Sequence, residues 1–357
     1  MANEDQKIAK IIESIALHHV APAANVKITH GPEVRDDCAV IQLSDTTDLV
    51  IGSDFVRGTG FRLFKAGYLN HFDVGYYMVA ANASDIAAMG AKPIGMTSIV
   101  RYSKSMTDEE FALLNEGITT ACKDFKMPLL GGDTGGYDSD VISGTSIGLC
   151  QHGKALLRSN ARTGDLVFTT GKYGVAAAAD AAFAQSDIHR LLTSEEGAEI
   201  LNAWKRVAPA MRQGAALSDL GLSECCIDSS DGLKDACYQI ATASNVNIVL
   251  REESVPIHPI TIKVAHNLGI DPMTLAVGDS VDFRLVFTVS PDKKIELIKV
   301  FTDNNWELYE IGEVIAQDVT VPSVQLQTVA GLTPMPGVAW DQSEKTALER
   351  VLQSTKS

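Results

Sequence analysis

Residues 82–91 read NASDIAAMGA, which places an aspartate inside a run of small and apolar residues. The run belongs to a longer segment, Val74 to Met89, whose alanines predict a helix packed closely against a sheet. An aspartate within an apolar helix has no solvent to keep it charged, so Asp85 requires a cation or a hydrogen-bond donor beside it. The segment therefore predicts a buried helix and, at Asp85, a site that holds charge.

Strand-like and helical runs alternate on both sides of this helix, which predicts a mixed α+β chain. We expect strands over residues 96–102, 141–150, 166–170, 283–289 and 306–311. We expect further helices that start after Thr107 as N-cap, after Gly174, at Ser194 and at Asp231. A length of 357 residues favours about two domains, and the turn-forming stretch RSNARTGD at 158–165 favours a junction there. The expected domains are residues 1–153 and 154–357.

The charge balance argues against two kinds of partner. The chain has 30 Lys and Arg against 45 Asp and Glu, a net charge of −15, whereas nucleic acids and anionic membranes select basic surfaces. No stretch reaches the roughly 18 apolar residues that a membrane span needs. The six cysteines are dispersed and form no CxxC pair, which is typical of reduced thiols. Since the N-terminus also lacks the apolar core of a signal peptide, we expect a cytoplasmic protein with no nucleic-acid or membrane partner.

Aspartates recur in small-residue turns beside apolar runs. They are Asp36–Asp37, Ser53–Asp54, Ser84–Asp85, Gly132–Asp133 and the DSSD stretch from Asp228 to Asp231. A single aspartate of this kind is more often a turn or N-cap residue, and Asp231 alone could cap the helix that it begins. Several such segments in one crevice would repel each other unless divalent cations lay between them. Carboxylates combined with hydroxyls are typical of Mg²⁺, which is usually shared with substrate phosphates.

Standard phosphate-binding loops are missing from the sequence, which contains neither GxxxxGK[ST] nor GxGxxG. Two weaker features remain. Arg158 could clamp a phosphate with its guanidinium, and the turn from Gly171 to Gly174 could offer free amides at a helix N-terminus. Each is more often an ordinary surface arginine or glycine turn.

The order of these segments resembles the thiamine-monophosphate kinase family. The segments are DDCAV (36–40), SD (53–54), NASDIAAMGA (82–91), GGDT (131–134), LRSNARTGD (157–165) and IDSSDGL (227–233). That family belongs to a superfamily with aminoimidazole ribonucleotide synthetase, selenophosphate synthetase and a hydrogenase maturation factor. The resemblance implies a fold of two α+β lobes, in which the N-terminal lobe forms a β-barrel-like interface with its copy in a homodimer. It also implies a C-terminal α/β sandwich lobe and a nucleotide bound at the dimer interface.

The resemblance implies ATP and Mg²⁺ as cofactors and gives each segment a role. The implied magnesium ligands are Asp36, Asp37, Ser53, Asp54, Asp85, Asp133, Asp228 and Asp231. The implied nucleotide contacts are Gly132, Asp133, Arg158 and Ser230. Asp133 and Asp231 would act at the transfer itself, in chemistry that needs positioning and charge stabilisation rather than a covalent nucleophile.

The acceptor side of the chain departs from the family pattern. The family's Val-His-Phe is Thr59-Gly60-Phe61 here, and its Gly-x-Lys is Gly75-Tyr76-Tyr77. A Gly-Glu-Asp-Tyr-Glu-Leu segment aligns with residues 280–285, which keep Asp282 but carry Arg284 in place of a glutamate. The implied substrate contacts are Gly60, Asp282, Arg284 and Trp340. Because carboxylates favour a cationic thiazolium, their loss disfavours it, while Arg284 suits an anionic acceptor.

The leading hypothesis is ATP- and Mg²⁺-dependent phosphoryl transfer to a small-molecule acceptor, which is thiamine phosphate if the family activity is kept. One alternative is a superfamily synthetase that phosphorylates an amide or carboxylate oxygen and releases phosphate. Another is a non-catalytic regulator that binds nucleotide without turnover.

Overall fold

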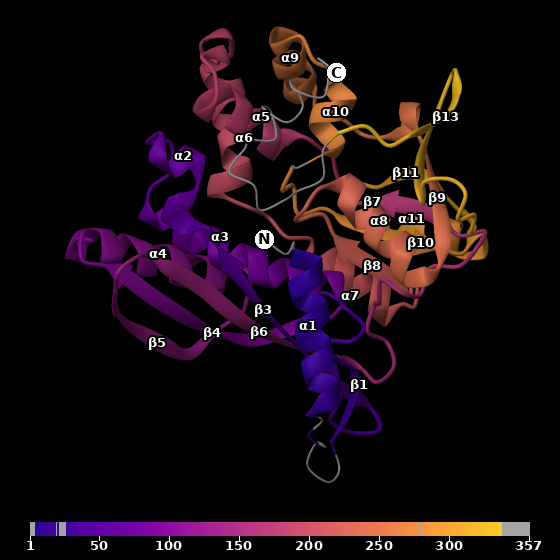
Figure 1. The fold of residues 1–357 in the computed structure, drawn as a ribbon, viewed down its shortest axis with the longest axis horizontal. Helices are drawn as coiled ribbons and strands as arrows, with labels where there is room; N and C mark the ends of the chain where they lie inside the picture. The colour runs from indigo at the N-terminus through magenta and orange to yellow at the C-terminus, as the bar shows by residue number, and fades with distance from the viewer. Residues whose placement is uncertain (1–3, 19, 21–25, 279, 338–357) are drawn as a thin grey trace.

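Two β-sheets organise the chain in a computed structural model, which describes residues 4–18, 20, 26–278 and 280–337 (Figure 1). The first sheet has the strand order β1-β2-β3-β6-β4-β5. Its strands are β1 (Lys27–His30), β2 (Ala39–Gln42), β3 (Thr47–Val56), β4 (Lys92–Ser103), β5 (Leu129–Tyr137) and β6 (Val141–Gln151). Neighbouring strands are antiparallel except β4 and β5, which are parallel and leave β5 as an exposed edge.

One face of the first sheet is covered by a pair of helices. Helix α3 (His71–Ala88) packs on β3 and β6, and α4 (Asp108–Asp124) packs on α3. A Cβ atom on Gly75 would lie 2.2 Å from the carbonyl oxygen of Leu114, and one on Gly117 would lie 2.0 Å from that of Phe72. The two helices therefore cross in direct backbone contact. Thr107 caps α4 as predicted, through a reciprocal pair of bonds with Glu110.

The second sheet has the strand order β13-β12-β9-β11-β7-β10-β8. Its strands are β7 (Leu166–Thr169), β8 (Cys225–Asp228), β9 (Val246–Arg251), β10 (Leu285–Val289), β11 (Tyr309–Ala316), β12 (Val324–Thr328) and β13 (Gly331–Pro334). The pairing is antiparallel except between β9 and β12. The strands of the first sheet thus all lie within residues 27–151, and those of the second all follow residue 165.

The remaining helices flank the two sheets. They are α1 (Glu4–Leu17), α2 (Arg62–Lys65), α5 (Val175–Ala179), α6 (Ser194–Lys205), α7 (Met211–Asp219), α8 (Leu233–Ser244), α9 (Pro259–Leu268), α10 (Pro272–Val277) and α11 (Lys294–Asp303). Helix α3 also contacts α6, α7 and β8, so a single buried helix joins the first sheet to the second half of the chain. Among the described residues, no helix is both long and apolar enough to cross a bilayer. All six cysteines are buried free thiols.

Two elements differ from the sequence-based expectation. The strand expected over 306–311 is β11, which begins at Tyr309, because Trp306 packs edge-on against Phe301 at the end of α11, with ring centroids 5.4 Å apart. The helix expected after Gly174 is short, since α5 ends at Ala179 and the chain continues as a π-helical turn over Asp180–Ala184.

Candidate metal centre

Three carboxylates from distant parts of the chain converge where α3 meets the second sheet. Asp37 precedes β2, Asp85 lies in α3, and Asp228 ends β8. One oxygen from each of these carboxylates lies within 4.8 Å of the other two. The structure therefore brings together three of the acids that the sequence singled out, which we call the carboxylate cluster.

Burial and like charge oppose the ionisation of the carboxylate cluster. Burial raises the pKa of Asp37 to about 8, and the charges of Asp228 and Asp36 add to the rise although Arg158 lowers it. The pKa of Asp85 is raised well above its ordinary value, first by burial and then by the neighbouring carboxylates, of which Asp228 acts most strongly. Asp37 Oδ2 is buried and has no hydrogen-bond partner among the described residues. A hard divalent cation would offset the repulsion and use this oxygen, so the residues present fit Mg²⁺.

Two side chains of the NASD segment, which the sequence analysis did not assign, position the acids. Ser84 donates a hydrogen bond from Oγ to Asp228 Oδ2, which ties α3 to the end of β8. Asn82 accepts a bond of 3.3 Å from the backbone N–H of Asp54 at the end of β3. The pKa of Asp54 is raised to about 6, chiefly by burial, and the charge of Asp228 adds to it. Asp54 therefore lies on the helix-covered side of the sheet, beside the carboxylate cluster.

Arg158 is the counter-ion of the neighbouring acids. Its guanidinium lies 2.5 Å from Asp37 Oδ1 and 3.3 Å from Asp36 Oδ1, and its backbone N–H donates to Asp36 Oδ2 at 3.1 Å. It also donates to Gln239 of α8, a contact that the sequence analysis missed. Arg158, which the sequence predicted to contact the nucleotide, is thus only 8% exposed. Its guanidinium pairs with Asp36 and Asp37, two of the predicted magnesium ligands.

The DSSD segment faces the same crevice. Ser230 donates to Asp228 Oδ1 from both its hydroxyl at 2.8 Å and its backbone N–H at 3.2 Å. Gly232 precedes α8 with φ of 94°, and a Cβ atom there would lie 1.8 Å from the carbonyl oxygen of Gly278. Because Gly232 takes the N-cap position, α8 begins at Leu233 and Asp231 does not cap it.

Ser53 and Asp133 of the GGDT segment lie on the opposite side of the first sheet. The register places Asp54, Gly144, Ser98 and Gly132 in one row across four strands. Ser53 and Asp133 belong to the alternate rows, whose side chains point to the other face. Ser53 contacts Thr145 there at 2.8 Å, and the 65% exposed Asp133 pairs with Arg101, whose hydrogen bond lowers the pKa of Asp133. Within one chain, these two predicted ligands are therefore not part of the carboxylate cluster.

The predicted acceptor residues Gly60, Asp282 and Trp340 differ in their surroundings. Gly60 is exposed at the end of a 3₁₀ turn that spans Gly58–Gly60. Asp282 accepts bonds from the backbone N–H groups of Gly174 at 2.7 Å and Ala176 at 3.1 Å, so its carboxylate is engaged at the start of α5. Trp340 lies outside the described residues.

Arg284 connects the acceptor side to the carboxylate cluster. Its backbone exchanges bonds with Ser229, which follows Asp228, at 2.8 Å and 2.9 Å. Its side chain lies half-buried over the glycine turn, where Nε donates to the carbonyl of Lys172 at 3.4 Å. The loop that carries Arg284 is therefore fixed to the segment that carries Asp228.

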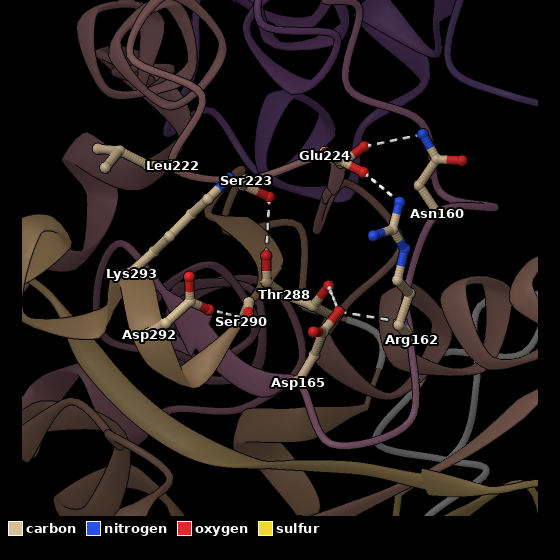
Figure 2. Close-up of a pocket in the computed structure, with 10 residues that line it drawn as sticks. All are labelled: Asn160, Arg162, Asp165, Leu222, Ser223, Glu224, Thr288, Ser290, Asp292 and Lys293. Carbon is tan, nitrogen blue, oxygen red and sulfur yellow. Dashed lines mark hydrogen bonds and ion pairs between the residues drawn. The ribbon is translucent and has the colours of Figure 1, made fainter.

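A separate cavity of about 220 Å³ lies beside the 158–165 turn (Figure 2). Its lining residues are Asn160, Arg162, Asp165, Leu222, Ser223, Glu224, Thr288, Ser290, Asp292 and Lys293. Arg162 pairs with Glu224 at 2.6 Å, and Asp165 accepts from Thr288 at 3.0 Å (Figure 2). Each of these charged side chains of the wall thus has a partner within the protein, and none of the predicted site residues lines the cavity.

The chain is similar to known proteins in sequence and in fold. Residues 35–150 match the family model described as AIR synthase related protein, N-terminal domain. The thiamine-monophosphate kinase of Pyrococcus abyssi is 32% identical over 73% of this chain and 78% of its own. The putative hydrogenase expression/formation protein MJ0676 of Methanocaldococcus jannaschii is 26% identical over 69% of this chain and 70% of its own.

The fold is also that of a solved structure. The structure described as "AaThiL complexed with AMPPCP and TMP" superposes with a TM-score of 0.76 at 18% identity, covering 96% of this chain and 97% of that one. The likeness covers the residues of both sheets. The chain therefore belongs to the thiamine-monophosphate kinase family of the aminoimidazole ribonucleotide synthetase superfamily.

Proposed function

We propose that the chain transfers the terminal phosphoryl group of ATP to thiamine phosphate, in the presence of Mg²⁺. The observation that carries this proposal is the convergence of Asp37, Asp85 and Asp228, with one buried carboxylate oxygen left without a hydrogen bond. The names of the relatives support the acceptor, and the AMPPCP and TMP of the similar structure support a site that takes a nucleotide and a phosphorylated partner together.

The chain's own residues would supply position and charge. Asp37, Asp85 and Asp228 would hold magnesium, with Asp54 and Asp231 beside them; when bound, the metal neutralises charge on the transferred phosphoryl group. Ser84 and Ser230 donate to the two oxygens of Asp228, which fixes the direction of this ligand. An acceptor phosphate is already largely ionised at neutral pH, so the transfer needs no strong general base and no covalent intermediate.

The acceptor site would hold an anion beside the cluster. Arg284 lies on the loop that is bonded to Ser229, next to Asp228, and its guanidinium could pair with the phosphate of the acceptor. Asp282 would contribute indirectly, because it holds the first amides of α5 rather than a ligand.

A second copy of the chain would complete the nucleotide site. The uncovered face of the first sheet exposes apolar side chains, including Phe55 at 55% and Ile99 at 47%, in the same row as Asp133. Patches of this kind on a sheet are typical of protein interfaces. We propose that two copies pack through this face and thereby bring Ser53 and Asp133 to the nucleotide.

One further candidate function is that of a superfamily synthetase, and a hydrogenase-related protein is among the relatives of the chain. A synthetase of that kind would phosphorylate an amide or carboxylate oxygen and release phosphate. The two functions differ in their products, because a kinase conserves the phosphoryl group on the acceptor.

The product assay tests the proposed function. Purified protein is incubated with ATP, Mg²⁺ and thiamine phosphate, and the products are separated by chromatography. We expect one thiamine diphosphate per ADP, no free phosphate, and loss of both products when EDTA removes the metal. ADP formed together with free phosphate, or no ADP with thiamine phosphate at any concentration tested, would contradict the kinase assignment.

A further inference from the structure

Tyr77 of α3 is a tyrosine with a buried ring and, within the described part of the chain, an unbonded hydroxyl. The residue is 6% exposed, yet no hydrogen bond joins its hydroxyl to any described residue. Buried tyrosines usually bond their hydroxyl, because an unpaired polar group in the interior costs free energy. The neighbouring Tyr76 follows that rule, since its hydroxyl donates to Asp124 at 3.1 Å.

The ring of Tyr77 is held by three aromatic side chains. It stacks on Trp204 of α6 with ring centroids 5.6 Å apart and planes 15° apart. It meets Phe61 edge-on at 5.0 Å and Phe283 edge-on at 5.5 Å. Phe61 follows Gly60, and Phe283 lies between Asp282 and Arg284, at a positive φ of 51°. The ring is therefore clamped among residues of the acceptor side, from both halves of the chain.

Tyr77 lies on the side of α3 that faces the acids of the candidate metal centre. Tyr77 lies seven residues before Ser84 in α3, which places both on one face of the helix, and Ser84 bonds Asp228. Burial raises the pKa of Tyr77 well above its ordinary value, and the charges of Asp54, Asp231 and Asp228 add to this. The group thus stays protonated, as a hydrogen-bond donor, at the edge of a crevice that is rich in carboxylates.

We propose that the Tyr77 hydroxyl donates a hydrogen bond to an anionic oxygen of the bound acceptor, and so fixes the acceptor between the aromatic ring cluster and the carboxylate cluster. The proposal rests on the proposed function, because it assigns a ligand to the same site. The acceptor is favoured over the nucleotide as the ligand because the ring packs on residues that flank Gly60 and Arg284.

The Tyr77→Phe variant removes only the hydroxyl and keeps the ring packing. Steady-state kinetics with thiamine phosphate should show the KM of the acceptor raised about 10-fold to 100-fold, the loss expected for a hydrogen bond to a charged group. The KM of ATP and the affinity for Mg²⁺·AMPPCP should not change. The melting temperature should stay the same or rise, because no hydrogen bond within the protein is lost.

Tyr76→Phe is the matched control, since its hydroxyl is bonded within the protein. It should lower the melting temperature and leave the KM of the acceptor unchanged. An unchanged acceptor KM in Tyr77→Phe, or a lowered melting temperature together with an equal loss for both substrates, would overturn the proposal.

Direct binding separates this proposal from the proposed function. Thiamine phosphate is titrated calorimetrically into protein that is saturated with Mg²⁺·AMPPCP. Weaker binding by Tyr77→Phe than by wild type supports the role of the hydroxyl even where the product assay finds no thiamine diphosphate. Equal binding by the two proteins counts against it even where the kinase assay succeeds.

Discussion

Asp37 shows how a single residue links the stability of the protein to its cofactor. Its carboxyl group is buried beside Asp85 and Asp228, and among the described residues only Arg158 opposes their repulsion with a positive charge at hydrogen-bond distance. Its pKa of about 8 lies far above the ordinary value of 3.8. The group is therefore most stable as the neutral acid when no cation is bound.

A pH dependence follows from this shift. Because the folded pKa of Asp37 exceeds the unfolded one, its contribution to stability is fully present below pH 3.8 and is lost as the pH rises through about 8. In EDTA, the free energy of unfolding should fall with rising pH across this window, by up to about 1.4 kcal/mol per pH unit from this group. Urea denaturation at pH 5 to 8 measures this change in the free energy of unfolding.

Two controls identify the group. Asp37→Asn should reduce the slope, because the amide does not titrate. Saturating Mg²⁺ should stabilise the wild type most at the high end of the range, since metal binds the ionised carboxylates. A slope that is the same in wild type and Asp37→Asn would show that this carboxyl is not the source.

At the scale of elements, patterns of local origin were predictable. The small-residue run predicted the buried helix α3, and Thr107 as N-cap predicted the start of α4. The end of α5 could not be predicted, because it depends on a π-helical turn. The start of β11 could not be predicted either, because it depends on the packing of Trp306 against α11. Such contacts between segments leave no periodic signal in the sequence.

The outer face of the first sheet is the proposed dimer interface, and a charge placed on it should separate the two copies. Ile99 lies in the row of Asp133, so Ile99→Asp would place an additional charge in the proposed dimer interface. Wild type should sediment at about twice 38.2 kDa, whereas Ile99→Asp should sediment as the 38.2 kDa monomer with weaker nucleotide binding.

The matched control is Ile295→Asp on α11, where the isoleucine is 82% exposed and remote from that sheet. It should leave the dimer intact. A wild-type protein that sediments at 38.2 kDa over a wide concentration range would contradict the proposed interface.

For the whole molecule, the identity of the acidic segments could be read from the sequence, but their arrangement could not. The sequence placed Asp37, Asp85 and Asp228 in one set with Ser53 and Asp133. The register of the sheet separates the last two from the others, because adjacent residues of a strand point to opposite faces. The supporting roles of Ser84 and Gln239 could not be predicted from the sequence. Their partners, Asp228 and Arg158, are distant in the chain and come near them only in the folded protein.

The central claim is that the carboxylate cluster binds magnesium together with the nucleotide. Calorimetric titration of Mg²⁺ into protein with AMPPCP, for wild type, Asp85→Asn and the exposed control Asp108→Asn, tests this claim most directly. Wild type and Asp108→Asn should bind Mg²⁺ equally, while Asp85→Asn should bind at least about 100-fold more weakly, since a charged ligand is lost from a buried site. Asp85→Asn should keep the wild-type melting temperature or exceed it, because burial and the neighbouring carboxylates already oppose the ionisation of this carboxyl group. Mg²⁺ binding by Asp85→Asn with the wild-type stoichiometry and affinity would contradict the account.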